Sequence, residues 1–232
     1  MKRFYRQAGL EEVAGGLNIV LDGRQVMTPT QQPLTVPSRA LATAIAAEWD
    51  AQGDAVDMAS MPMTGLGFAV LDHVAPNRDG IITQLRGYAE TDLLCHFEDG
   101  DAGLMARQTA SWQPVLDWAR DTLELPLQPT TGIMPAAQDP TVVSGYGERL
   151  EAFDDWHLTG VSQAVSLTGS ILLGLALIMR EIGVKAAHQA SLVDELYQAE
   201  RWGSDEGAAV RRGQLQADLA ITRRFVDLLD EC

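Results

Sequence analysis

The N-terminal part of the chain has the alternating apolar and polar positions that are typical of a β-hairpin. Apolar side chains recur at every second position from Leu17 to Leu21, which is the period of a strand with one buried face. The next two residues, Asp22-Gly23, are a favoured pair for a tight hairpin turn. We therefore expect the chain to return in a second strand at residues 25–28.

The segment after this hairpin is interrupted by prolines. A short strand is expected at 34–36, because Pro33 and Pro37 on either side limit its length. Ser38 is a good N-cap for a helix that ends near Gly53. The first sixty residues are thus predicted to be a small β-rich unit with one helix.

From about residue 61 onward the apolar positions recur at helical spacing. The expected helices are one that Asn77 caps and that runs through Tyr88, and others near 102–123, 141–153, 156–182, 186–202 and 205–230. Residues 128–140 show no regular pattern and are expected to be a long connection. The sequence therefore predicts an α+β protein, with a β-rich domain at 1–60 and an all-α domain at 61–232.

One predicted helix contains an uncharged stretch, residues 160–179. Eight of its residues are serine, threonine, glutamine or glycine, so it is a poor membrane span. A helix that is apolar on all sides is typical of the centre of a helical core. We expect a buried helix without membrane insertion, and a membrane-attached assembly protein stays as an alternative.

Charge narrows the classes of partner. The 32 acidic residues outnumber the 17 basic ones, which gives a net charge of −15. This balance argues against binding to nucleic acid and to anionic membrane surfaces, since both need a basic face. Two cysteines cannot build a disulfide framework and fit a reducing compartment. Glu11 and Glu12 follow the N-terminus where a targeting peptide would be apolar or basic, so we expect a cytoplasmic protein.

Motifs for cofactor, metal or nucleophile chemistry are absent from the sequence. There is no phosphate-binding loop, and the four histidines are far apart and outside any metal-ligand spacing. The segment 160–164 lacks the last glycine of a nucleophile elbow and lies in a helical pattern. We therefore expect no cofactor, no metal and no catalytic residue. The enzymatic alternative is a small-molecule hydrolase or transferase that uses carboxylates such as Asp92 or Asp194 in a deep polar pocket.

Two stretches combine acidic and aromatic residues. Residues 90–101 contain five acids. Within this stretch, Asp92, Leu93 and Phe97 are a candidate contact surface. Residues 194–206 also contain five acids, interleaved with aromatic side chains. Such surfaces suit the recognition of a protein with exposed basic and apolar groups. The alternative is that the aromatic residues belong to the core and the acids only keep the surface soluble.

Eight segments spread over nearly the whole chain are KRFYR (2–6), LDGRQVMTP (21–29), AEWDAQG (47–53), MPMT (61–64), YAETDLLC (88–95), WQPVLDW (112–118), TGS (168–170) and DELYQAERWG (194–203). In this order the segments resemble those of the assembly chaperones for the alpha subunit of F-type ATP synthase. The chain departs from the family pattern at Gly65, where an arginine is usual, and at His96-Phe97-Glu98, where an aromatic and a basic residue are usual.

The resemblance implies a β-rich N-terminal part, a helical C-terminal part and no enzymatic activity. It implies that the protein binds the newly made alpha subunit, without ATP, and shields it until the beta subunit replaces the chaperone. A bacterial, cytoplasmic protein that is monomeric when free is expected, whereas eukaryotic relatives act in the mitochondrial matrix.

The resemblance also suggests where the client binds. Acidic residues after the Trp-Gly pair matter in this family, which puts forward Asp205 and Glu206. Glu195 and Glu200 of the preceding helix, together with Trp202, complete the candidate client-binding set. Asp92, Leu93 and Phe97 remain a secondary candidate surface.

Overall fold

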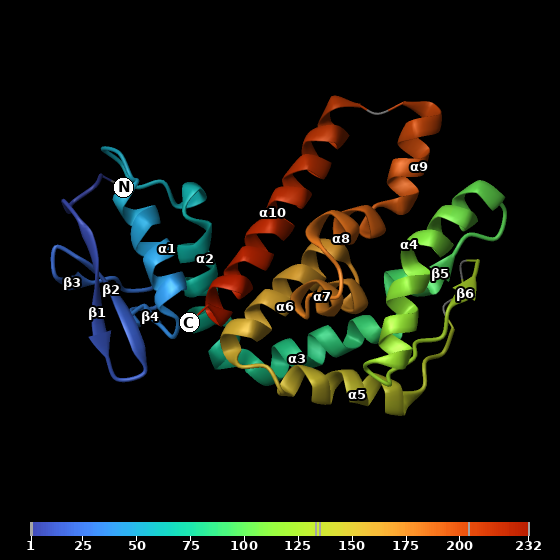
Figure 1. The fold of residues 1–232 in the computed structure, drawn as a ribbon, viewed down its shortest axis with the longest axis horizontal. Coiled ribbons are helices and arrows are strands. Elements are labelled where there is room, and N and C mark those ends of the chain that lie inside the picture. The colour runs from blue at the N-terminus through green and yellow to red at the C-terminus, as the bar shows by residue number, and fades with distance from the viewer. Residues whose placement is uncertain (1, 133, 135, 204, 232) are drawn as a thin grey trace. The chain divides into compact units, whose positions relative to one another are not determined.

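The computed structural model describes residues 2–132, 134, 136–203 and 205–231. They form two compact units, of which one takes its residues from 1–78, 154–159 and 224–232, and the other from 79–153 and 160–223. The predicted α+β class is confirmed, since a small antiparallel sheet precedes a helical remainder (Figure 1). The boundary between domains at residue 60 stays a prediction.

The first unit contains a four-stranded antiparallel sheet, made of β1 (Ala8–Val13), β2 (Gly16–Leu21), β3 (Arg24–Gln25) and β4 (Thr35–Val36). Central strand β2 pairs with the three others. The turn predicted at Asp22-Gly23 is confirmed, because both residues have positive φ angles of 49° and 80°. Strand β1 gave no periodic signal, since its edge position leaves Glu11 and Glu12 exposed.

Helix α1 (Arg39–Asp50) packs against this sheet through Leu41 and Trp49, which are buried (Figure 1). Its predicted cap is confirmed, because the Ser38 hydroxyl accepts a hydrogen bond from the Leu41 N–H at 3.4 Å. Helix α2 (Pro62–Ala69) follows and is held by α1. The Glu48 carboxylate accepts hydrogen bonds from the first free N–H groups of α2 at 2.7 and 2.8 Å.

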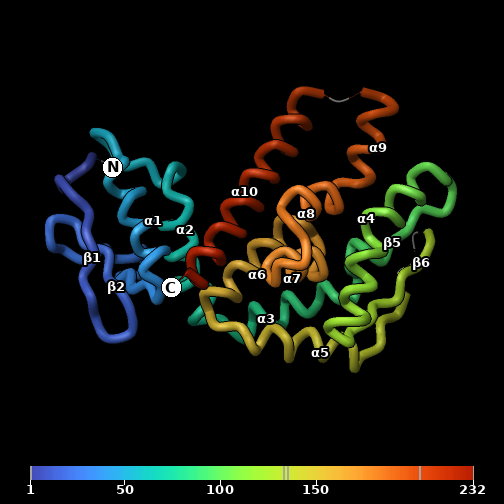
Figure 2. The backbone as a smooth tube through the Cα atoms, viewed as in Figure 1, coloured from blue at the N-terminus to red at the C-terminus, as the bar shows by residue number. Residues whose placement is uncertain are grey.

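The remaining regular elements are α3 (Arg78–Gly87), β5 (His96–Phe97), α4 (Ala102–Asp121), β6 (Thr130–Thr131), α5 (Pro140–Glu151), α6 (Asp155–Thr168), α7 (Ile171–Ile178), α8 (Val184–Ser191), α9 (Val193–Trp202) and α10 (Glu206–Asp230). Short 3₁₀ or π turns link some of them, at Met58–Ser60, Val70–Val74, Ala75–Asn77, Tyr88–Glu90 and Leu93–Cys95. Strands β5 and β6 form a two-residue parallel pair that lies beside α4 (Figure 2).

Helix α7 is the centre of the helical core, since all eight of its residues are buried. This agrees with the buried helix predicted from the uncharged stretch. None of the helices among the described residues is long and apolar enough to cross a membrane. Gly174 allows α6 and α7 to approach closely, because a Cβ atom there would lie 2.5 Å from the Val165 side chain.

Two predicted helices are each divided into two. The predicted helix 156–182 breaks after Thr168, where Gly169 adopts a φ of +71° and Ser170 caps the new helix α7. The predicted helix 186–202 breaks at Leu192. The indole of Trp112 donates a hydrogen bond to the Ala190 carbonyl at 2.8 Å, which occupies an acceptor that an uninterrupted helix would use.

Candidate partner-binding surface

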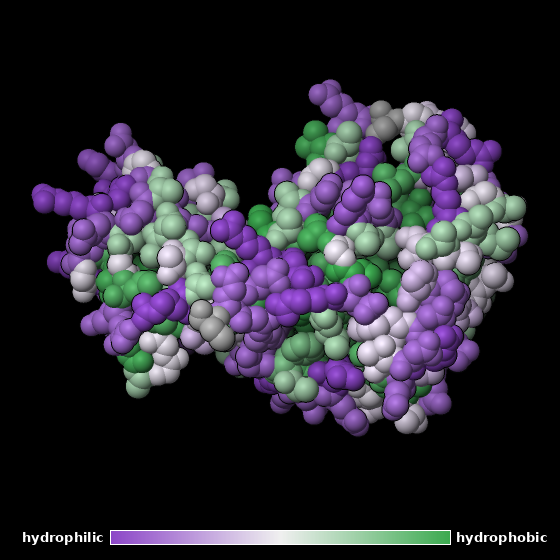
Figure 3. All heavy atoms as spheres, viewed as in Figure 1, coloured by the Kyte–Doolittle hydropathy of each residue, from purple (hydrophilic) through white to green (hydrophobic). Residues whose placement is uncertain are grey.

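The C-terminal end of α9 and the start of α10 enclose an open cavity of about 320 Å³. Its walls include three of the candidate residues, Glu195, Trp202 and Asp205, together with Arg211 and Arg212. We call this the α9–α10 surface. Figure 3 shows hydrophobic side chains between α9 and the upper part of α10, bordered by hydrophilic ones.

Trp202 is the dominant feature of the α9–α10 surface, because 75% of this large apolar residue is exposed. It is the last residue of α9, and Gly203 ends the helix with a positive φ of 87°. The Arg201 guanidinium lies over the indole ring, 5.7 Å from its centroid. The indole is therefore exposed to solvent and lies beside the positive charge of Arg201.

A network from two helices holds Arg201 in place. Arg201 pairs with Asp101 at the start of α4, and Asp101 accepts a further hydrogen bond from the Tyr197 hydroxyl at 2.8 Å. The Arg107 and Arg201 guanidinium groups both lie near the Tyr197 ring, at 5.0 and 5.3 Å from its centroid. Hydrogen bonding by Tyr197 is the main cause that lowers the pKa of Asp101. The carboxylate at this junction therefore stays charged.

The acidic candidates on α9 are paired with arginines at the surface. Glu195 accepts a hydrogen bond from Arg212 of α10 at 2.7 Å, and its side chain is 45% exposed. Glu200 pairs with Arg107 of α4 and is 59% exposed. The hydrogen bond from Arg107 lowers the pKa of Glu200. Glu200 thus lies toward α4 rather than among the residues that line the α9–α10 cavity.

Asp205 caps α10, because its carboxylate accepts a hydrogen bond from the Ala208 N–H at 2.9 Å. Glu206 is exposed in the first turn of the helix, where the helix dipole favours an acid. Sequence reasoning missed Val210, which is 66% exposed on α10, because a lone apolar residue at helical spacing gives no indication of the side it faces.

The secondary candidates lie in a different environment. Asp92 is fully buried, and it accepts hydrogen bonds from the Leu94 and Leu172 N–H groups and from the Ser170 hydroxyl. Burial raises the pKa of Asp92 to about 6, although these hydrogen bonds oppose the shift. The assignment of Asp92 to a contact surface disagrees with this burial, since its carboxylate is enclosed by its own chain.

Leu93 and Phe97 are half-buried. The Phe97 ring packs edge-on against Trp112 with ring centroids 5.3 Å apart. Neither residue lines the α9–α10 cavity, so the structure does not bring the two sets of candidates together there.

Among the described residues, no three His, Cys, Asp or Glu side chains are placed to bind a metal ion. Cys95 is buried, and burial together with the nearby Asp92 raises the pKa of its thiol to about 12. The thiolate needed for nucleophilic or ligand chemistry is therefore strongly disfavoured.

Several known proteins are similar to this chain in sequence, and two of them also in fold. Residues 2–120 match the family model of the ATP12 chaperone protein. The crystal structure of Atp12 from Paracoccus denitrificans is 38% identical, with a TM-score of 0.95 and 98% of each chain covered. A chaperone candidate from Agrobacterium tumefaciens is 33% identical, with a TM-score of 0.93 over 99% of this chain and 86% of that one. The mitochondrial protein atp12 of Schizosaccharomyces pombe is 24% identical over 219 residues, which are 89% of this chain and 75% of the relative.

The match of the family model extends over half of the chain, and the two bacterial structures align with nearly all of it. This chain therefore belongs to the ATP12 chaperone family, the ATP synthase assembly chaperones that its sequence resembles.

Proposed function

We propose that this protein binds the unassembled alpha subunit of F-type ATP synthase and holds it, without ATP, until the beta subunit takes its place. The client contacts the α9–α10 surface through Trp202, with Glu195, Asp205 and Glu206 as an acidic border and Glu200 beside it. The single observation that best supports this placement is the exposed Trp202 indole, held in place by Arg201 beside a cavity whose walls carry both acidic and basic side chains.

The chemistry of this surface suits an assembly intermediate. An unassembled subunit exposes apolar and charged groups that its neighbour will later cover, and such patches aggregate. Large aromatic side chains and arginines are the residues that most often dominate protein interfaces. The net charge of −15 speeds the capture of a basic face by electrostatic steering. Release occurs because beta competes for an overlapping surface, so the affinity for alpha is moderate.

The enzymatic alternative has less support. Asp92 is enclosed in the core, and the Asp194 carboxylate accepts a hydrogen bond from the Gln108 side chain at 2.8 Å. The Ser170 hydroxyl that contacts Asp92 is buried with it, and the group that donates to Asp194 is an amide. Neither carboxylate therefore has the accessible acid–base partner that catalysis requires. We therefore propose a binding protein rather than an enzyme. We place its action in the bacterial cytoplasm, in keeping with the bacterial relatives of known structure.

A co-expression pull-down tests the function. The tagged protein is expressed with the alpha subunit of the same organism, and separately with the beta subunit as the control. We expect selective capture of alpha, an increase in its soluble fraction, and release when purified beta is added. Capture should persist after enzymatic removal of ATP. A folded protein that fails to capture alpha would contradict the proposal.

Matched variants test the surface. Trp202→Ala and Asp205→Asn change the client-facing groups, and asparagine preserves the cap of α10. Met58→Ala is the control, because Met58 is also an exposed apolar residue but lies in the first unit. We expect the first two variants to capture less alpha and the control to capture a normal amount. Unchanged capture by both surface variants would contradict the placement of the client on the α9–α10 surface, but it would not contradict the proposed chaperone function.

A further inference from the structure

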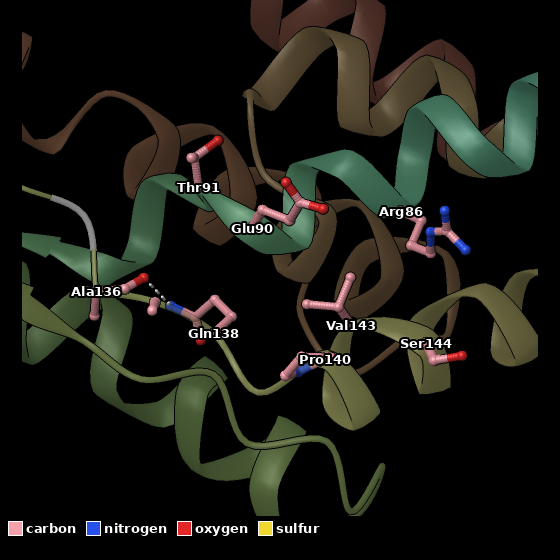
Figure 4. Close-up of a pocket in the computed structure, with 9 residues that line it drawn as sticks. Arg86, Glu90, Thr91, Ala136, Gln138, Pro140, Val143 and Ser144 are labelled. Atoms are coloured by element: carbon pink, nitrogen blue, oxygen red, sulfur yellow. Dashed lines mark hydrogen bonds between the residues drawn. The ribbon is translucent and has the colours of Figure 1, made fainter.

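The helical unit has a second hollow surface, which shares no lining residue with the α9–α10 cavity. Two adjoining cavities of about 650 and 380 Å³ share Arg86 and Ser144 as wall residues. We call them together the α3–α5 groove. Figure 4 shows the larger cavity, with Arg86 and Glu90 on one wall and Val143 and Ser144 on the other.

The walls of the groove are two helical faces that run antiparallel. Glu90, in the 3₁₀ turn after α3, lies at the end lined by residues 140–144 of α5. Asp79, at the start of α3, lies at the end lined by residues 147–151. Eleven helical residues span about 16 Å. The groove is thus long enough for about three turns of a helix or five residues of an extended peptide.

The groove is preformed. Its floor is apolar, since Ile82 and Val143 are buried there. Gly147 allows Arg86 to lie across α5, because a Cβ atom at Gly147 would stand only 3.3 Å from the Arg86 Cδ. The wall before α5 is fixed by Gln138, whose side chain accepts a hydrogen bond from the Gln128 N–H at 2.7 Å and donates one to its carbonyl at 3.0 Å.

The charges on the walls follow a simple order. Four exposed carboxylates belong to the groove, Glu90 at one end and Asp79, Glu148 and Glu151 at the other. Arg86 lies between them and lines both cavities. No hydrogen bond or ion pair joins its guanidinium to another described residue. The groove therefore complements a ligand that is basic at both ends, apolar in the middle, and carries a carboxylate or carbonyl opposite the arginine.

We propose that the α3–α5 groove binds a basic amphipathic segment of the client polypeptide, in addition to the contact at the α9–α10 surface. This inference rests on the proposed function, because the alpha subunit supplies the segment. Basic side chains of the segment pair with Glu90 at one end and Glu148 at the other. An apolar side chain lies on the floor at Val143. Two separate contacts on one client then strengthen binding together, although each alone is weak.

Charge reversal tests the groove directly. The double variant Glu90→Lys/Glu148→Lys and the wild-type chain, carrying different tags, compete for a limiting amount of alpha subunit. We expect the variant to bind at least tenfold more weakly. The control Glu11→Lys/Glu124→Lys changes the net charge by the same amount at exposed positions outside the groove and should stay within twofold. Thermal melting confirms that both variants are folded.

Arg86→Ala separates recognition from general attraction. This change makes the groove more acidic, so non-specific attraction of a basic client predicts tighter binding. If the groove instead recognises the order of charges along the client segment, binding should be weaker by about three- to tenfold, because the segment's carboxylate or carbonyl loses its partner Arg86. Tighter binding by Arg86→Ala would overturn the proposed register of the segment.

A photo-cross-linker at Ser144 identifies the occupant. We expect a cross-link to a basic segment of alpha, and none from the same cross-linker at Glu11. A cross-link to a second copy of this chain, or to beta alone, would overturn the inference. If the wild type captures alpha and the double variant competes equally, the groove inference fails and the proposed function stands. If the wild type captures no alpha at all, the proposed function fails, and the groove inference with it.

Discussion

Residues 90–101 and 194–206 contain five acidic residues each, interleaved with apolar side chains, yet the structure uses their carboxylates differently. In the first stretch, Asp92 and Asp101 bind backbone N–H groups at the starts of helices. In the second, Glu195 and Glu200 pair with arginine side chains at the surface. Asp92 is thus part of the structural core, whereas Glu195 and Glu200 remain at an accessible surface.

The difference lies in what each carboxylate would lose on meeting a partner. Backbone donors bound by Asp92 have no other acceptor in the core, so this carboxylate is committed to the fold. A surface arginine such as Arg107 can be solvated by water when Glu200 is drawn away, at little cost. Glu200 can therefore exchange its partner, as the proposed contact with a client requires.

Removal of the buried carboxylate is the most severe test of this comparison. Asp92→Ala leaves the Leu94 and Leu172 N–H groups without their acceptor, and each unsatisfied buried donor costs about 1–3 kcal/mol. We expect the free energy of unfolding to fall by about 2–4 kcal/mol, as measured by urea denaturation. The matched change at the surface, Glu200→Ala, should stay within about 0.5 kcal/mol, because both members of its ion pair are exposed. Equal effects from both variants would erase the distinction.

The titration of Asp92 gives a second test. Its pKa is raised from 3.8 to about 6 by burial, so the folded state holds the proton more tightly than the unfolded state. The stabilisation from this proton is complete below about pH 4 and is lost as the pH rises through about 6. It amounts to at most about 3 kcal/mol.

Denaturation at several pH values measures this contribution. Asp92→Asn removes the titrating group but preserves a hydrogen-bond acceptor. Between pH 4 and 6 the wild type should therefore lose stability relative to the variant, and the difference between their free energies of unfolding should shift by that amount. A constant difference over this range would mean that Asp92 titrates normally.

The sequence predicted those features whose interacting residues are close together in the chain. The turn at Asp22-Gly23 and the Ser38 cap are examples, because their partners lie within a few residues. The position of Asp92 could not be predicted, since Ser170 and Leu172 reach it from about eighty residues away. The break that makes Ser170 a helix cap was missed for the same reason.

The sequence put forward residues for a client-binding surface but did not predict how they are arranged. Composition and family resemblance indicated Trp202 and the acids around it. The contact of Arg107 with Tyr197 joins α4 to α9, and nothing local in the sequence predicts which arginine meets which ring. The exposure of Val210 also depends on how α10 packs.

Trp202→Ala tests whether Trp202 contributes to binding of the client without contributing to the stability of the fold. Because most of the indole is already exposed, its loss should change the free energy of unfolding by no more than about 0.5 kcal/mol. Binding of alpha should weaken by about thirtyfold, the effect of losing an aromatic interface anchor worth about 2 kcal/mol. Trp202→Phe should recover part of the affinity. A large loss of stability in Trp202→Ala would instead make Trp202 part of the core.

The smallest effect on the fold is expected from the surface ion pairs themselves. Glu195→Gln and Glu200→Gln preserve the size of each side chain and remove only the charge that faces Arg212 or Arg107. The melting temperature should change little, because the Glu200–Arg107 pair is exposed and a glutamine at position 195 still offers Arg212 a hydrogen-bond acceptor. Capture of alpha at 50 and 300 mM salt is the informative measurement. If these acids meet a basic client face, the double variant should bind more weakly at low salt and lose most of the wild type's salt dependence, since screening acts on the charges that were removed. A salt dependence equal to that of the wild type would show that the acids of α9 serve only to pair with their own arginines, as Asp92 serves only its own backbone.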